Sequence, residues 1–186
     1  MSYYKATSFR DSNGEKTNFG NDGKYTNCNP RLYFSFGLNS DKLNLFGSIP
    51  YFFNTYEDNN SNNSNSDFGE IELGLRFNLK KYNDNYLMGA VIAYLPAYQN
   101  NKIPFAGYER YGIEPRLIYA GTSHALGNYN NFHKVELGLR YFLPDNPLQL
   151  RLYASEGYEI LPKIILLGEL DVILSTSSNS DFFENK

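Results

Sequence analysis

The sequence contains no tryptophan, only one cysteine, Cys28, and no long apolar run. One cysteine cannot form a disulfide within the chain, so no intramolecular cross-link holds the fold together. No segment approaches the roughly 18 apolar residues of a membrane-spanning helix, which excludes helical spans but not strands, whose average hydropathy is lower. The formal net charge of −3 gives no basic surface for nucleic acid.

Alternation of apolar and polar residues is the main pattern that is present. Between residues 68 and 79, apolar residues occupy every second position, and Glu, Gly, Arg or Asn occupy the positions between them. The segment 132–143 repeats the pattern, and ELGLRF at 72–77 nearly coincides with ELGLRY at 136–141. A period of two over this length predicts strands with unlike faces.

Weaker alternation predicts further strands near residues 3–10, 32–38, 43–51, 88–94, 113–119, 148–154 and 164–174. In the segment 88–94, we assign Met88, Ala90, Ile92 and Tyr94 to the apolar face. Turn residues predict short connections at 39–42, 82–85 and 144–147. The Asn- and Ser-rich stretch 57–67 predicts a long, mobile polar loop.

These features predict an all-β fold, namely an antiparallel up-and-down (meander) β-barrel of the transmembrane type. We expect about nine strands in a single domain over residues 1–186, many with room for the roughly 9–11 residues of a tilted bilayer crossing. No signal peptide and no terminal strand are recognised, so we expect a fragment that lacks its export signal and its last strand or strands.

A soluble, lipocalin-like ligand-binding barrel, with its apolar residues inside, stays an alternative. The membrane version is favoured because the polar faces carry glycine and both signs of charge, while Lys and Arg are scarce on the apolar faces. Aromatic residues near the strand ends also suit an interfacial girdle. These aromatic residues are Tyr51, Phe52, Phe53, Tyr94, Tyr98, Tyr141 and Phe142.

Several motifs, in this order along the chain, resemble a known family. LYFSFGLNSDKLNL at 32–45, followed by IPY at 49–51, resembles a hairpin of the MetA-pathway-of-phenol-degradation family of outer-membrane proteins, although that hairpin more often has Thr-Asp after leucine. ELGLRF at 72–77 and VELGLRY at 135–141 resemble the related XagA-like proteins, as do Glu114, Arg116, Leu117, Tyr119 and Gly121 between them. The resemblance covers about residues 30–176. It implies a barrel in the outer membrane of Gram-negative bacteria, with transport as the expected function and no catalytic residues.

Candidate chemical groups are few. His124 and His133 are the only histidines, and neither has a cysteine or carboxylate at metal-ligand spacing. Ser123 precedes His124, but no nucleophile elbow or orienting acid accompanies the pair. Cys28 lies in a polar stretch, where an unreactive thiol is expected. We therefore predict no enzyme activity, no metal site and no cofactor.

The polar faces carry the charges that we expect to face the lumen. They are Glu70, Glu72, Arg76, Glu114, Arg116, Lys134, Glu136, Arg140, Arg151, Glu169 and Asp171. Either they pair across neighbouring strands and make the interior rigid, or they line a narrow pore for a polar solute.

The expected function is a narrow channel or porin for uptake or export of a small solute. The alternative from another class is a structural or surface-interaction barrel with a closed lumen, because side chains nearly fill a barrel of this size. The expected partners are outer-membrane lipid and a small solute, and not nucleic acid.

Overall fold

The structure is a computed structural model that describes residues 2–10, 15–39, 42–99, 109–123, 131–143, 148–161 and 164–175. These residues are almost all in strands, with one 3₁₀ turn, η1 (Gly20–Asp22). Within these ranges, no helix has the length and apolar character needed to cross a membrane.

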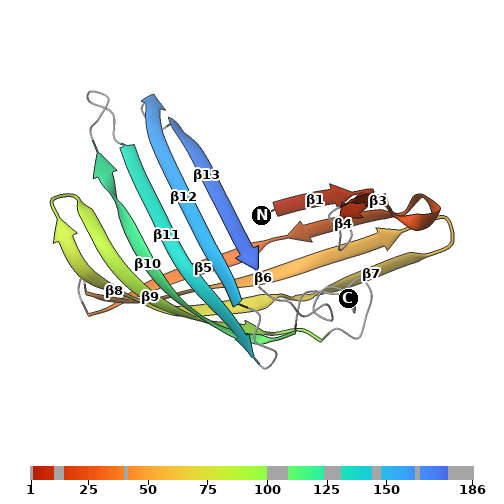
Figure 1. Cartoon of the computed structure of the whole chain (residues 1–186), viewed down its shortest axis with the longest axis horizontal. Helices are drawn as coiled ribbons and strands as arrows, with labels where there is room; N and C mark the ends of the chain where they lie inside the picture. Colours follow the sequence, from red (N-terminus) through yellow and green to blue (C-terminus); the bar gives the residue numbers. More distant parts are fainter. Residues whose placement is uncertain are drawn as a thin grey trace.

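Eight long strands form one antiparallel meander, which we call the wall (Figure 1). Its strands are β5 (Arg31–Asn39), the first half of β6 (Leu43–Glu57), β8 (Glu70–Tyr82), β9 (Asn85–Pro96), β10 (Tyr111–Ser123), β11 (Asn131–Leu143), β12 (Leu148–Leu161) and β13 (Ile164–Ser175). Each pairs with the next in this order. The predicted all-β meander is therefore confirmed.

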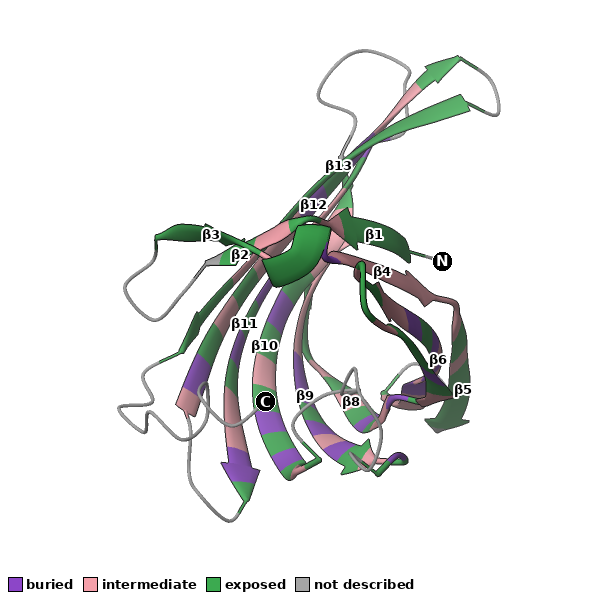
Figure 2. Cartoon of the chain, turned by 90° about the vertical axis from the view of Figure 1, so that its right-hand side faces the viewer, coloured by how far each residue is buried: buried purple, intermediate pink, exposed green. Residues whose placement is uncertain are grey.

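The wall is not a closed barrel. Among the described residues, β5 pairs only with β6, and β13 pairs only with β12. Figure 2 shows the wall as a curved sheet with these two strands at its edges. The predicted strand near 3–10 is divided into β1 (Ser2–Ala6) and β2 (Ser8–Arg10), and neither of them pairs with a described strand of the wall.

A second sheet, which we call the extension, leaves the wall along β6 (Figure 1). Its order is β1, β4 (Lys24–Asn29), the second half of β6, and β7 (Asn62–Phe68), and β2 forms a separate hairpin with β3 (Lys16–Asn18). Pro30 separates β4 from β5, and Gly69 separates β7 from β8. Both interruptions lie beside Pro50 and Tyr51, since Tyr51 N donates to Pro30 O (2.9 Å) and Gly69 N donates to Pro50 O (2.8 Å).

The predicted long loop at 57–67 is wrong for most of its length. Residues 62–68 form β7, which pairs with β6 in unbroken register from Tyr51↔Phe68 to Glu57↔Asn62. Asn and Ser have low strand propensity, but a long neighbouring strand supplies the backbone partners that propensity alone does not predict. Only residues 58–61 remain as a turn, in which Asp58 Oδ1 accepts hydrogen bonds from Asn60 N (2.8 Å) and Ser61 N (2.7 Å).

The two faces of the wall differ sharply. On one face, cross-strand rows are apolar, and one row runs through Phe36, Leu45, Leu75, Val91 and Pro115. The large side chains on this face are exposed, as Leu75 (44%) and Val91 (45%) illustrate. On the other face, Tyr94, Glu114 and Phe142 are each 0% exposed. Within the described residues, no second layer covers this sheet, so such burial occurs on the inside of its curve, and we call the two faces convex and concave.

Register corrects two sequence predictions about faces. Ile92 pairs with Glu114 in β10, so Met88, Ala90, Ile92 and Tyr94 lie on the concave face with the charges and not on the apolar convex face. β9 is apolar on both faces, so alternation could not choose between them. Phe52, Tyr94 and Phe142 are also buried on the concave side and are not part of an exposed girdle.

Other aromatic residues do lie on the convex face at the two ends of the wall. At the end nearest the extension, the Tyr51 ring lies 5.0 Å from Phe53 and 5.3 Å from Phe68, and Tyr141 lies on the same face. At the opposite end, the rings of Tyr119 and His133 lie 5.6 Å apart.

The predicted turn at 82–85 is confirmed, and Asn83 in this turn has a left-handed backbone conformation with a φ of 51°. The predicted turns at 39–42 and 144–147 fall wholly or partly outside the described residues.

Candidate functional site: a charged layer on the concave face

All eleven charged residues predicted from the sequence lie in described strands, and register places them on the concave face. Glu72 pairs with Tyr94, and Arg116 pairs with Ala90 on one side and Gly138 on the other. Glu136 pairs with Tyr153, which pairs in turn with Asp171. Register thus gives these charges one common face, and whether that face lines a lumen stays a prediction.

Glu114 is the centre of this layer. Its Oε2 accepts hydrogen bonds from Tyr94 Oη (2.7 Å) and Arg140 Nε (2.9 Å), and its Oε1 accepts one from Arg116 Nε (2.7 Å). The Arg140 guanidinium also lies 3.8 Å from the centre of the Tyr94 ring. A carboxylate that is wholly buried but bound by two guanidinium groups is satisfied, whereas the same carboxylate alone would be very costly.

Glu136 extends the layer along β11. Arg116 Nη1 lies 2.6 Å from Glu136 Oε2, and Lys134 Nζ lies 3.0 Å from Glu136 Oε1. Arg116 therefore bridges two carboxylates, Glu114 and Glu136, from adjacent strands. The side chains of Arg116 and Glu136 are each only 10% exposed, so solvent screens this pair less than a surface pair.

Three further pairs lie nearer the edges of the wall. Arg151 binds Asp171 with two hydrogen bonds, of 3.1 and 2.7 Å, but the Asp171 side chain is 42% exposed. Tyr153 Oη donates to Glu169 Oε1 (2.5 Å). At the other edge, Arg31 Nη1 lies 3.3 Å from Glu72 Oε1 and so links β5 to β8 across β6.

Two predicted residues are less closely integrated. The Arg76 guanidinium lies 5.8 Å from the Phe46 ring, and its buried Nε has no hydrogen-bond partner among the described residues. Glu70 is at the junction with the extension, opposite Pro96. Neither contacts Glu114 through a described hydrogen bond or ion pair. The layer therefore has a dense centre on β9–β11 and looser margins.

Sequence reasoning missed three members of the layer, which are Tyr94, Tyr153 and Arg31. Tyr94 was placed on the wrong face, and Arg31 lies next to a proline at the start of its strand. The signal that could have found Tyr153 was its position between Arg151 and Ser155 on the polar face of β12.

Glycine makes room for the central carboxylate. A Cβ added to Gly138 would lie 2.5 Å from Glu114 Oε1. On the same face, a Cβ at Gly74 would lie 2.6 Å from the Phe46 ring. The glycines of the two ELGLR motifs thus allow large neighbouring side chains to fold over the sheet.

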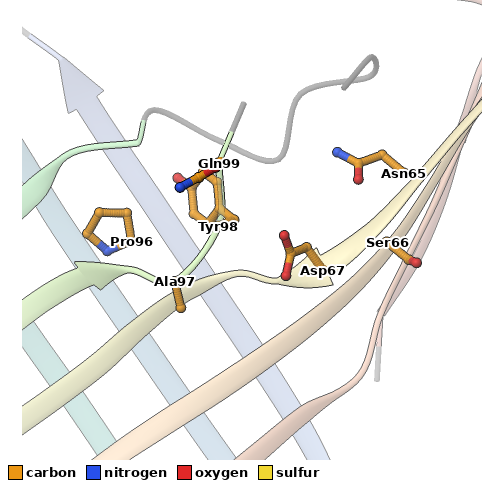
Figure 3. A pocket seen from close by; sticks show the side chains of 7 residues that line it. All are labelled: Asn65, Ser66, Asp67, Pro96, Ala97, Tyr98 and Gln99. Carbon is orange, nitrogen blue, oxygen red and sulfur yellow. The ribbon is translucent and has the colours of Figure 1, made fainter. Parts of the chain in front are cut away.

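A polar pocket of about 420 Å³ lies where β7 meets the end of β9. Figure 3 shows its lining, with Asn65 and Asp67 on the β7 side and Tyr98 and Gln99 on the segment after β9. The Tyr98 ring packs edge-on against Phe52 at 6.3 Å, and its Oη accepts a hydrogen bond from Glu109 N (3.0 Å). This pocket is at the junction of wall and extension and is separate from the charged layer.

The other candidate residues are not brought together. Cys28 is a free, partly buried thiol in β4, and Ser123 ends β10. His133 lies beside Tyr119, and His124 falls outside the described residues. In the described part of the chain, no three His, Cys, Asp or Glu side chains are grouped as metal ligands.

Comparisons with known proteins supply no further constraint on this site. No protein-family model, no curated protein and no solved structure matches the chain. The functional argument therefore rests on the geometry of the wall.

Proposed function

We propose that the wall is the membrane-embedded part of a bacterial outer-membrane β-barrel. The supporting observation is the convex face, where the described rows from Phe34, Gly47 and Leu73 to Phe77, Leu117 and Leu137 hold no charged residue. In the next row, Lys80 pairs with Leu87 at the bulge in β8. The charged Glu156 lies one row further, opposite His133, at the end of the wall. An uncharged exposed band with aromatic residues at its ends matches the lipid-facing surface of such barrels.

Barrel closure is the second part of this proposal. Since the wall has eight antiparallel strands, its first strand, β5, and its last, β13, run in opposite directions and have the orientation of an antiparallel pair. Both carry apolar residues on the convex face. On the concave face, β5 offers Arg31 and Tyr33, and β13 offers Glu169 and Asp171, which are complementary in charge and hydrogen bonding. Bacterial outer-membrane barrels have even strand numbers.

Within this proposal, a closed lumen is favoured over a channel. Glu114 and its partners already bury one another on a sheet that is still open, and an eight-stranded barrel has an interior just wide enough for side chains. We therefore infer a structural or surface-interaction barrel that holds the extension outside the lipid. The polar strand β7 and the polar pocket beside it are the surface offered to partners.

The narrow channel for a small solute is the second candidate. It is supported by the presence of both signs of charge on the concave face, with Arg116 and Glu136 close together. Single-channel recording separates the two functions. Stable conductance steps whose ion selectivity changes in Arg140→Ala would establish a channel, and silence despite verified insertion would favour the closed lumen.

Closure and membrane insertion are tested together. After refolding into detergent micelles, the protein should migrate faster on SDS gels before boiling than after it, as closed barrels do. In a Cys28→Ser background, Phe36→Cys should be linked within one chain by a short bis-maleimide to a cysteine at position 166, 170 or 174. The matched control, a cysteine at 137, should not be linked to position 36. A protein that stays monodisperse without detergent and shows neither result would contradict the proposal.

A further inference from the structure

The polar pocket at the junction of wall and extension lies between two anchored segments. On one side, β7 keeps unbroken register with β6, and Asn65 continues the cross-strand row of Asn27 and Asn54. On the other side, Ala97 N donates a hydrogen bond to Gly69 O (3.4 Å), which holds the segment after β9 beside β7. Both walls of the pocket therefore exist before a ligand arrives, and this reduces the ordering cost of binding.

Tyr98 fixes the second wall of the pocket from two directions. Its ring packs edge-on against Phe52 of β6, and its Oη accepts the hydrogen bond from Glu109 N (3.0 Å), just before β10. Tyr98 is only 6% exposed, and Asn65 on the facing wall is only 7% exposed. The lining therefore includes buried side chains that packing holds in place.

The chemistry of the lining is polar and nearly neutral. Asn65 and Gln99 carry amides, and each amide both donates and accepts hydrogen bonds. Asp67 is the one charged residue in the described lining. In the described part of the chain, its one hydrogen bond is donated by Phe68 N to Oδ1 (2.8 Å), so Oδ2 stays open to a ligand. Pro96 adds an apolar ring surface beside these polar groups.

These groups disfavour several classes of ligand. The described lining holds no Lys, Arg or His, and Asp67 would repel an anion. Calcium takes about 6–8 oxygen ligands, whereas among the described residues no three His, Cys, Asp or Glu side chains are grouped. An apolar ligand would leave the amides without hydrogen bonds. A neutral molecule with many hydroxyl groups fits best, because each hydroxyl both donates and accepts.

The end of the wall at which the pocket lies indicates the source of such a molecule. The two shortest connections between wall strands, 83–84 and 162–163, lie at the end away from the extension. The two longest, the extension and the connection 97–110, leave the wall at the other end, beside the pocket (Figure 1). Outer-membrane barrels place short turns in the periplasm and longer loops outside the cell. In the proposed barrel, the pocket therefore faces the cell exterior.

The pocket also faces away from the surface that we assign to lipid. Asn65 pairs with Asn54, and Asp67 pairs with Phe52, so both side chains lie on the concave side of the sheet. Figure 3 shows them on the side of β7 that faces Tyr98. A sugar attached to a neighbouring membrane lipid would approach the convex side. A free sugar in the external medium reaches the concave side directly.

We propose that this pocket binds one ring of a free, neutral sugar or oligosaccharide, and this inference rests on the proposed outer-membrane location. The amides of Asn65 and Gln99 and the carboxylate of Asp67 bind the hydroxyl groups, and Pro96 contacts the C–H face of the ring. The volume of about 420 Å³ lies within the range of small-molecule pockets, which is roughly 300–1,000 Å³. The partner of the extension is thus a carbohydrate in the external medium.

Binding to a glycan array tests the site. The full chain, refolded in lauryldimethylamine oxide micelles, which carry no sugar, is applied to neutral oligosaccharides of glucose, galactose, mannose and N-acetylglucosamine. We expect one group of related glycans to be retained, and Gln99→Ala to bind them about tenfold more weakly through the lost hydrogen bonds. Asn63→Ala removes an exposed amide from the same face of β7 outside the pocket, and this control should bind as the parent does. Asp67→Asn keeps an acceptor without the charge and should retain most of the binding.

Each other outcome overturns a distinct claim. No retained glycan, or equal retention in Gln99→Ala with the circular dichroism of the parent, would overturn the sugar site and leave the gel-mobility test of the barrel unaffected. Complete loss in Asp67→Asn would show that charge carries the binding and would overturn a neutral ligand. If vesicles with lipopolysaccharide bind and no free glycan does, the free source is overturned. Sugar binding by a chain without heat-dependent gel mobility would support the site and contradict the membrane proposal instead.

Discussion

The wall and the extension share a strand, β6, yet they solve the problem of burying polar groups differently. In the wall, β8 beside β6 alternates apolar and charged residues, and the buried polar layer is ionic, with Glu114 held by Arg116 and Arg140. In the extension, β7 is polar on both faces, and the buried polar layer is neutral, with Asn27 Nδ2 donating to Asn54 Oδ1 (2.5 Å). The same backbone continues through both regions. The side chains of the partner strands, and not β6 itself, therefore set the polarity of each region.

The boundary between the two regions is narrow. Pro30 and Gly69 interrupt the two strands beside β6 at one level, and the aromatic cluster of Tyr51, Phe53 and Phe68 lies next to it. On the wall side of this boundary the convex face is apolar, whereas on the extension side β7 carries Ser and Asn. Aromatic rings of this kind favour the interface between hydrocarbon and water.

The largest expected effect comes from removing the centre of the ionic layer. Glu114→Ala leaves Arg116 and Arg140 buried without their shared carboxylate, and breaking a buried pair in this way costs about 3–5 kcal/mol. Asn54→Ala removes a neutral partner in the extension, and an unsatisfied amide costs about 1–3 kcal/mol. Urea unfolding in micelles should show this order, and equal losses would contradict the contrast between the two layers.

A charge placed on the convex side tests the solvent of each region. If the convex face meets lipid as proposed, Leu137→Arg in the wall places a charge in the lipid and should lose about 2–4 kcal/mol of unfolding free energy in vesicles. Ser64→Arg, on the exposed face of β7, should change stability by no more than about 0.5 kcal/mol. If both variants unfold at the parent urea concentration, the convex face of the wall is not in lipid.

A smaller effect is expected from filling the space over a glycine. Gly138→Ala forces the Glu114 carboxylate to move, and overpacking of this kind costs about 1–3 kcal/mol. Gly20→Ala in the extension meets no atom within 4 Å and serves as the control. Thermal unfolding should separate the two, and a stable Gly138→Ala would mean that the central carboxylate has room to spare.

The smallest effect concerns the turn at the tip of the extension. The pKa of Asp58 is lowered from 3.8, chiefly by the hydrogen bond from Asn60 N, with further hydrogen bonds from Ser61. Because the folded-state pKa is depressed, the contribution of this carboxylate is complete above pH 3.8 and is lost as pH falls through the lowered value. Carboxyl NMR titration should find a midpoint below 3.8, and Ser61→Ala should raise it. A midpoint at or above 3.8 would show that the turn does not form in solution.

Much of the wall could be predicted from the sequence because alternation specifies both strand and face. β8 and β11 are unambiguous, since Glu72, Arg76 and Arg140 leave no doubt about their polar faces. β9 is different: its apolar residues occupy both faces, and only pairing with β10 shows that Ile92 lies beside Glu114. The strand β7 could not be predicted, because its stability comes from a partner in register and not from its own Asn and Ser residues.

The charged layer was predictable as a set of residues but not as a network. Alternation assigned Glu114, Arg116 and Glu136 to one face, but it carries no information about which guanidinium reaches which carboxylate. That choice depends on the register between strands, on the curvature of the sheet and on the space above Gly138. The barrel closure proposed above and the membrane location stay predictions.

The most direct test of the central claim is a site-directed spin-label scan along β11 in vesicles, one residue at a time from 135 to 141, in a Cys28→Ser background. The account predicts that collision with oxygen peaks at 135, 137, 139 and 141, on the convex face, and is low at 136, 138 and 140. Collision with a water-soluble nickel chelate should be low at the convex positions. High nickel access at Leu137 and Leu139, equal to that at Ser64 in the extension, would show that the convex face meets water and would contradict the account.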